Sequence, residues 1–227
     1  METVLITGAS RGIGLELTKR FLGLNYKVIS TYRDQPSVEL EKLLSYKSLS
    51  LVELEVTDEA SIDKLESYLM GTQIDILINN AGVKGPVDQS MTAIKSQDWL
   101  NTFAINSIAP LMISRTVLKN MEKSENPRII TISSQMGAIN TDSIGLYAYR
   151  SSKTAVNKIM KILALELKEQ NIAVCLIHPG WVITDMGGQD AEITVDESVT
   201  GIVNLVSNLT MEHSGKFLTW QGNEHVW

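Results

Sequence analysis

Tyr149 and Lys153 have the residue types and the spacing that a proton transfer requires. They stand four positions apart, so in a helix their side chains lie on one face and can serve one bound molecule. A phenol is a poor acid or base at neutral pH, because its ordinary pKa is about 10. A cation held close and the positive end of a helix that begins near Tyr149 both favour the phenolate. We therefore expect the pKa of Tyr149 to fall toward neutrality, where the phenol can exchange a proton with a substrate oxygen.

A Tyr and a Lys at this spacing also occur in helices that carry out no chemistry, where the ring packs on a neighbour and the ammonium is solvated. Tyr147 illustrates this, since the residue four positions later is Ser151 and no cation accompanies the phenol. The pair therefore indicates chemistry only if the rest of the chain supplies a place for a reactant.

A glycine-rich stretch near the N-terminus has the features of a phosphate-binding turn. The segment TGASRGIG, residues 7–14, follows the short apolar run 3–7 and precedes a stretch with helical periodicity. Glycine lets a backbone approach a pyrophosphate closely, and a helix N-terminus presents free N–H groups to it. The spacing G-x-x-x-G-x-G differs from the common dinucleotide fingerprint G-x-G-x-x-G, and a turn without a ligand is the alternative. The residues of this stretch expected to bind a dinucleotide are Gly8, Ser10, Arg11, Gly12, Ile13 and Gly14.

The residues after the second predicted strand, 27–32, bear on the choice of cofactor. In dinucleotide-binding units an acidic residue here binds the ribose 2′-hydroxyl, whereas an arginine suits the 2′-phosphate. Tyr32 and Arg33 come first and Asp34 only afterwards, and Arg11 adds a second cation from the glycine turn. Two guanidinium groups that converge on one phosphate favour NADP(H) over NAD(H). NAD(H) stays possible if Asp34 turns toward the ribose, and both arginines are otherwise ordinary surface residues.

Other candidate contacts follow predicted strands, at the sheet edge where open α/β sheets bind their ligands. Glu55 would accept a hydrogen bond from an adenine amine and Val56 would pack on the ring, although an exposed acidic residue is the simpler alternative. The set expected to bind the dinucleotide beyond the glycine turn is Arg33, Glu55, Val56, Asn80, Ala81, Gly82, Tyr149, Lys153, Pro179, Gly180, Val182 and Thr184.

Two further positions bear on catalysis. A buried-type strand over residues 128–132 ends in Ser133 and Ser134, whose hydroxyls can there donate to a substrate carbonyl beside Tyr149. Turn serines without that role would look the same. Asn106 lies within a predicted long helix, residues 98–122, where nothing in the pattern calls for an amide. Its carbonyl is therefore expected to hold a water molecule that contacts Lys153.

Predicted strands alternate with predicted helices along the chain, which is the pattern of an α/β fold. The remaining strands are expected at 48–56, 74–78, 172–177 and 216–220, and the helices at 37–45, 61–70, 98–122, 149–170 and 198–209. No repeat or linker interrupts them, so residues 1–227 are expected to form a single NAD(P)-binding domain. The polar, glycine-containing stretch at about 184–198 is expected to be a substrate loop, or else a plain surface loop.

Composition limits the function classes. The 227 residues, 44% of them hydrophobic, suit a globular domain, and a net charge of −6 argues against a nucleic-acid partner. The single cysteine, Cys175, cannot form an internal disulfide, and without clustered histidines no metal site is expected. We find no leader peptide and no apolar run of about 18 residues, so we expect a cytoplasmic protein without membrane attachment. Two long helices offer a self-complementary face for a homodimer or homotetramer.

Taken together and in order, the motifs TGASRGIG, NNAG, the Asn of FAINS, ISS, YRSSK and HPGWVITDMGG resemble those of the short-chain dehydrogenase/reductase family. The resemblance covers nearly the whole chain, and the YAYRSSK helix and the ending SGKFLTWQGNEHVW are similar to those of the C-factor and sniffer-like carbonyl reductase group. It implies a Rossmann-type, doubly wound parallel sheet of about seven strands with helices on both faces. The catalytic tetrad that it implies is Asn106, Ser134, Tyr149 and Lys153.

The resemblance also implies a role for each member of that tetrad. Tyr149 would be the general acid in reduction and Ser134 the anchor of the carbonyl. Lys153 would tune the pKa and bind ribose, and Asn106 would hold a proton-relay water. Glu55 departs from the aspartate that is more usual at its position.

The leading hypothesis is an NADPH-dependent oxidoreductase, a carbonyl reductase that converts an aldehyde or ketone to an alcohol. Its partner is then a small-molecule carbonyl or alcohol. The alternative is a dinucleotide-binding signalling or scaffold protein of the same fold without turnover. A sugar-nucleotide epimerase is disfavoured, because little chain remains after the sixth strand to build a substrate domain.

Overall fold

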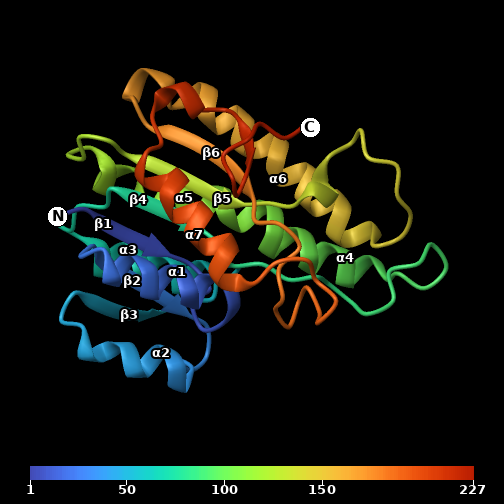
Figure 1. Cartoon of the computed structure of the whole chain (residues 1–227), viewed down its shortest axis with the longest axis horizontal. Helices are drawn as coiled ribbons and strands as arrows, with labels where there is room; N and C mark the ends of the chain where they lie inside the picture. Colours follow the sequence, from blue (N-terminus) through green and yellow to red (C-terminus); the bar gives the residue numbers. More distant parts are fainter.

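The computed structural model describes all residues from Met1 to Trp227 and contains one sheet of seven strands, all paired in parallel (Figure 1). The strand order is β3-β2-β1-β4-β5-β6-β7. Strands β1 to β3 are added in one direction and β4 to β7 in the other, so the topological switch point lies between β1 and β4. This order confirms the predicted Rossmann-type, doubly wound sheet. The strands are β1 Thr3–Ile6, β2 Lys27–Tyr32, β3 Leu49–Glu53, β4 Ile76–Asn79, β5 Arg128–Ile132, β6 Ala173–His178 and β7 Phe217–Thr219.

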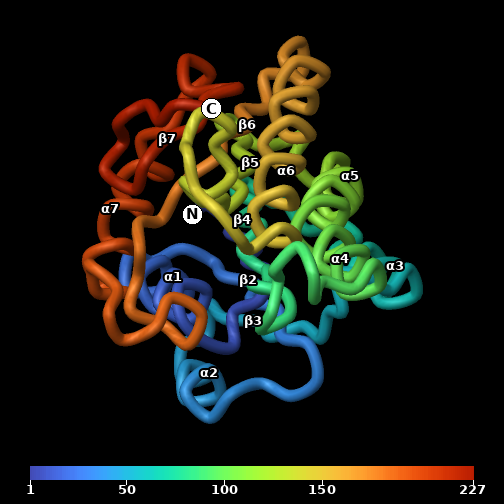
Figure 2. The backbone as a smooth tube through the Cα atoms, turned by 90° about the vertical axis from the view of Figure 1, so that its right-hand side faces the viewer, coloured from blue at the N-terminus to red at the C-terminus, as the bar shows by residue number.

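Helices cover both faces of the sheet, because the strands are apolar on both sides. In β1, Val4 and Ile6 belong to a core of 22 buried residues shared with α1 and α7, whereas Leu5 belongs to a second core of 22 on the other face. Figure 2 shows α1 and α7 on one side and α3, α4, α5 and α6 on the other. None of the helices is both long and apolar enough to cross a membrane. They are α1 Gly12–Gly23, α2 Val38–Lys42, α3 Glu59–Leu69, α4 Ser96–Phe103, α5 Ala109–Met121, α6 Tyr147–Glu166 and α7 Val195–Ser207.

The long helix predicted at 98–122 is in fact two helices, α4 and α5, joined by a π-helical turn, Ala104–Ile108. Pro110 gives the physical reason, because it has no N–H to donate to the carbonyl of Asn106 four residues earlier. The turn places Asn106 in the interior, with 1% of its surface exposed. Such widened turns inside helices are frequent at functional sites.

The predicted substrate loop at 184–198 is shorter than expected, because α7 begins at Val195 rather than at Ser198. Thr194 and Glu197 form a capping box, in which each side chain accepts a hydrogen bond from the other residue's backbone N–H. This box fixes the helix start, so the irregular part of the loop ends at Thr194.

Parallel strands deliver the loops that follow them to a single edge of the sheet, where ligands bind in open α/β folds. Figure 1 shows the loops 83–95, 138–146 and 184–194 projecting beyond this edge, on the right. The residues expected to take part in chemistry lie in or beside these loops and the turns at the strand ends.

Candidate active site

Helix α6 brings Tyr149 and Lys153 to this edge. It begins at Tyr147, earlier than predicted, after Leu146 in a left-handed conformation with φ 53°. Lys153 Nζ lies 5.9 Å from the centre of the Tyr149 ring. Lys153 is buried and donates a hydrogen bond of 2.9 Å to the carbonyl of Ile132, the last residue of β5. The phenol and the ammonium therefore lie together, as their spacing predicts.

Burial sets the protonation of both groups. It lowers the pKa of Lys153 to about 8, because an ammonium loses solvation in the interior. Burial also raises the pKa of Tyr149, and the interaction of the phenol with Ser134 offsets only part of that rise. The expectation that the pKa of Tyr149 falls is therefore wrong for this structure, because desolvation of the phenolate outweighs the other influences. The phenol keeps its proton at neutral pH, which is the form that a general acid needs.

Of the two serines after β5, Ser134 is the one whose hydroxyl interacts with the phenol of Tyr149 and offsets part of the rise in its pKa that burial causes. Its Oγ accepts a hydrogen bond of 3.1 Å from Met136 N, so its own proton remains available to donate. The hydroxyl of Ser133 donates its proton to Asn157 Oδ1 at 2.5 Å in the interior, so it is not available to donate to a substrate. The carbonyl-anchoring role of Ser134 that the family resemblance implies stays a prediction.

Asn106 lies near the ammonium, and both ends of its amide are engaged. Oδ1 accepts a hydrogen bond of 2.9 Å from Val83 N, and Nδ2 donates to Val83 O at 2.8 Å and to Ser152 Oγ at 3.0 Å. A Cβ placed on Gly82 would lie 3.3 Å from Asn106 Oδ1 and 3.7 Å from Lys153 Nζ. The view that packing gives no reason for an amide here is wrong, because this amide fastens the loop after β4 to α6. The water-holding role of its carbonyl stays a prediction.

The glycine turn after β1 packs tightly against the loop after β4. Gly8 has φ 68°, and a Cβ placed on it would come within 2.9 Å of Ala81 Cα. A Cβ on Gly14 would lie 2.4 Å from the carbonyl oxygen of Gly8 and 2.5 Å from Asn80 Nδ2. Asn80 Nδ2 donates to the carbonyls of Thr7 and Gly8, both at 3.0 Å. The side chain of Asn80 therefore shapes the turn, and only glycine fits at the two contact positions.

The N-terminus of α1 offers hydrogen-bond donors to an anion. The helix begins at Gly12 with Arg11 at the N-cap position, and neither a side-chain cap nor an acidic residue occupies its first turn. Its first N–H groups therefore lack a side-chain acceptor, as in helix ends that bind phosphate. Thr184 lies opposite, with its Cγ2 3.5 Å from the place of a Gly12 Cβ. Within the turn, the carbonyl of Ser10 accepts a hydrogen bond of 2.6 Å from the hydroxyl of Ser37, the N-cap residue of α2. Ile13 packs against the hydrophobic core.

The two arginines expected to bind a 2′-phosphate pair with surface carboxylates. Arg11 Nη1 lies 2.8 Å from Asp185 Oδ2, which joins the glycine turn to the loop after β6. Arg33 Nε lies 3.0 Å from Asp34 Oδ2 and 4.0 Å from Glu55 Oε2. The Arg11 and Arg33 side chains are 78% and 65% exposed, so these pairs contribute little to stability and both guanidinium groups can turn to another anion.

Glu55 and Val56 lie beyond the end of β3, which stops at Glu53 instead of continuing to Val56. The sheet pairing ends there, and the Glu55 N–H donates to Ser61 Oγ at 2.9 Å. The carboxylate folds back, so that Glu55 Oε1 accepts hydrogen bonds from Thr57 N at 3.1 Å and Thr57 Oγ1 at 2.9 Å. Val56 is buried. The predicted adenine contact of Glu55 would therefore fall to Oε2, which lies 4.0 Å from Arg33 Nε.

The residues after β6 complete this edge. Gly180 has φ 88°, and a Cβ placed on it would lie 2.4 Å from Ile193 Cδ1. Val182 is buried and forms a parallel bridge with Ile193. The carbonyl of Pro179 accepts a hydrogen bond of 2.6 Å from a serine of α7. These contacts hold the start of the loop that carries Thr184 against α7.

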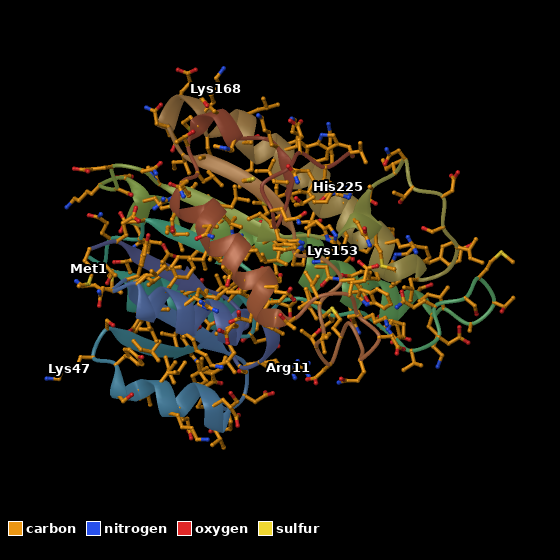
Figure 3. The ribbon with its side chains drawn as sticks, in the orientation of Figure 1. Met1, Arg11, Lys47, Lys153, Lys168 and His225 are labelled. Atoms are coloured by element: carbon orange, nitrogen blue, oxygen red, sulfur yellow. The ribbon has the colours of Figure 1, made fainter.

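A cavity of about 390 Å³ opens at this edge between the glycine turn, the loop after β4 and α4. Its lining includes Arg11, Lys84, Pro86 and Met186. Figure 3 shows Arg11 and Lys153 on the same half of the molecule, away from Met1. Sequence reasoning does not find Lys84 or Pro86, because the stretch after NNAG matches no motif and its place in the cavity depends on the folded loop.

Comparison with known proteins adds to this geometry. Residues 2–195 match the model of the short chain dehydrogenase family. The C-signal protein of Myxococcus xanthus is 38% identical over 156 residues, which cover 68% of this chain and 93% of that protein.

Two solved structures share the fold over the full length. The NADPH-bound carbonyl reductase from chicken fatty liver is 36% identical, with a TM-score of 0.91 over 100% of this chain and 99% of the other. Carbonyl reductase Sniffer of D. melanogaster is 33% identical, with a TM-score of 0.92 over 100% of both chains. Together with the glycine turn and the Tyr149–Lys153 pair, these matches show that the chain belongs to the short-chain dehydrogenase family of NAD(P)-dependent oxidoreductases.

Proposed function

We propose that the protein is an NADPH-dependent reductase that converts the carbonyl of an aldehyde or ketone to an alcohol. The observation that carries this proposal is the place of the Tyr149 phenol, which interacts with the Ser134 hydroxyl at the end of β5 and lies one helical turn from Lys153. A carbonyl oxygen between the phenol and the Ser134 hydroxyl has a hydrogen-bond donor on each side.

The residues at this edge fit a dinucleotide phosphate. The first turn of α1 has neither a side-chain cap nor an acidic residue, so its N–H groups can receive a pyrophosphate. Arg11 and Arg33 are exposed cations that suit a 2′-phosphate, which supports NADPH over NADH. The chicken relative binds NADPH. When bound, the nicotinamide supplies the hydride.

The protein's own side chains hold the substrate and move the proton. The Ser134 hydroxyl donates a hydrogen bond to the carbonyl oxygen and fixes its position. Tyr149 transfers its phenolic proton to that oxygen as negative charge develops on it. The positive charge of Lys153, whose pKa is about 8, stabilises the phenolate left behind. Asn106 supports this arrangement by holding the loop after β4 against α6.

Residues 184–194 form the substrate loop of this proposal, within a single NAD(P)-binding domain over residues 1–227, because α7 takes up the last residues of the predicted stretch 184–198. Asp185 and Met186 line the cavity, and Asp185 pairs with Arg11, which lines it too. Trp181 Nε1 donates a hydrogen bond of 2.8 Å to the carbonyl of Gly187. This bond ties the loop to the residues just before it. A substrate entering the cavity would therefore contact this loop.

The test follows NADPH absorbance with purified protein and a panel of aldehydes, ketones and quinones. Tyr149→Phe removes the proposed acid, and Tyr147→Phe is the matched control, because Tyr147 is 42% exposed and packs against Trp99. Wild type and Tyr147→Phe are expected to oxidise NADPH, and Tyr149→Phe to be slower by at least about 100-fold. Tight NADPH binding without turnover of any carbonyl would favour the scaffold alternative.

A further inference from the structure

The start of α6 has no cap of its own. Leu146 occupies the N-cap position, its side chain makes no capping hydrogen bond, and the first turn contains no acidic residue. The first N–H groups of a helix have no acceptor within the helix, so this helix needs an acceptor from elsewhere. The need matters for function because the first turn carries Tyr149.

Gln89, in the loop after β4, supplies that acceptor. Its Oε1 accepts a hydrogen bond of 3.0 Å from Tyr149 N. Its Nε2 donates to the carbonyls of Lys84 at 2.8 Å and Pro86 at 3.0 Å. Two carbonyls on one side and an N–H on the other define the orientation of the amide. Gln89 is 3% exposed, so water cannot easily replace these bonds if the amide is lost.

The same amide also shapes a wall of the cavity, because Lys84, Gly85 and Pro86 line it. Gly85 has φ 85°, and a Cβ placed on it would lie 2.8 Å from Thr102 Oγ1 of α4 and 3.3 Å from Gln89 Nε2. The loop is thus held closely between α4 and the Gln89 amide. One side chain therefore joins a wall of the cavity to the backbone of Tyr149.

We propose that Gln89 is a positioning residue for the reaction, whose amide sets the place of Tyr149 relative to the bound reactants by capping α6 from the loop 83–95. This inference rests on the proposed function, in which Tyr149 is the general acid. Gln89 acts through Tyr149 and touches no reacting atom. Since a displacement of about 1 Å in a catalytic group can slow a reaction on the order of 100-fold, loss of the cap should appear in kcat.

Two variants separate the two ends of the amide. Gln89→Met keeps an unbranched side chain of similar length and removes all three hydrogen bonds. Gln89→Glu keeps an acceptor for Tyr149 N and leaves at most one donor, the hydroxyl of a protonated carboxyl, for the two loop carbonyls. We expect Gln89→Met to lower kcat by roughly 10- to 100-fold. We expect Gln89→Glu to keep kcat within about threefold of wild type and to raise KM for the carbonyl substrate, because the cavity wall is loosened.

Asn120→Leu is the matched control for general destabilisation. Asn120 Nδ2 donates to the carbonyls of Leu69 at 2.7 Å and Thr72 at 2.8 Å, so it holds a loop by the same chemistry ahead of β4, at the opposite edge of the sheet. Asn120→Leu is expected to lower Tm about as much as Gln89→Met does and to leave kcat and KM unchanged.

Wild-type kcat in Gln89→Met would overturn the inference. An equal loss of kcat in Asn120→Leu would overturn it too, because a loss common to both variants reflects stability alone. If Gln89→Met does not fold, Gln89→Glu decides: a drop in kcat of about tenfold or more in folded Gln89→Glu, assayed well below its own Tm, contradicts the capping role. An inactive wild type overturns the proposed function as well, whereas active wild type, inactive Tyr149→Phe and fully active Gln89→Met overturn this inference alone.

Discussion

Lys153 Nζ lies 5.9 Å from the centre of the Tyr149 ring, and its hydrogen bond goes to the carbonyl of Ile132. The last residue of β5 therefore anchors the ammonium, while α6 carries both groups. Burial lowers the pKa of Lys153 to about 8 and raises that of Tyr149, so a protonated phenol stands beside a cation that gives up its proton readily. This arrangement suits a group that donates a proton and then needs its phenolate stabilised.

The buried ammonium of Lys153 is expected to make stability depend on alkaline pH. The pKa of Lys153 is about 8 in the folded protein against an ordinary value of 10.5, so between these values the unfolded chain binds more protons. Its contribution to the free energy of unfolding therefore rises with pH across this window. Urea unfolding of wild type and Lys153→Met should show the wild type gaining roughly 2 to 3 kcal/mol relative to the variant between about pH 7 and pH 10. Parallel pH curves for the two proteins would contradict this.

Sequence patterns predict the sheet well, because runs of β-branched residues bounded by glycine and polar residues mark strands that are buried on both faces. They also predict that Tyr149 and Lys153 share a face, since helical spacing alone decides it. They do not predict the rise in the pKa of Tyr149, because burial is a property of the folded chain. The role of Gln89 cannot be predicted for a similar reason, because its partner Tyr149 is 60 positions away and no local sequence pattern links the two residues. The interruption of the predicted helix 98–122 around Asn106 had one local indication in the sequence, which is Pro110.

Arg11 and Arg33 are expected to set the preference for NADPH. Both guanidinium groups are exposed and paired with carboxylates that a 2′-phosphate can replace. Arg11→Ala and Arg33→Ala should each weaken NADPH binding by roughly tenfold or more and leave NADH binding within about twofold. Arg20 lies in α1, the helix that Arg11 precedes, and pairs with Asp196. Arg20→Ala is the control and should change neither the NADPH nor the NADH affinity. Fluorescence titrations with the two nucleotides decide this, and equal losses for both would count against the assignment.

His178 is expected to make stability depend on acidic pH. Burial, aided by the neighbouring His225, lowers the pKa of His178 to about 4, and its Nδ1 has no hydrogen-bond partner. The unfolded chain takes up this proton near pH 6.5, so the contribution of His178 to stability is lost as the pH falls from there toward 4. Wild type should lose about 3 kcal/mol relative to His178→Gln between about pH 7 and pH 4 in urea unfolding. A slope unchanged in His178→Gln would refute the assignment.

The central claim is that Tyr149 gives the proton in the reduction. Its most direct test is the single-turnover rate of hydride transfer from saturating NADPH to a carbonyl substrate, measured by stopped flow in wild type and in Tyr149→Phe. The account predicts that the variant binds NADPH as wild type does and transfers hydride at least about 100-fold more slowly. Equal transfer rates in the two proteins would contradict it.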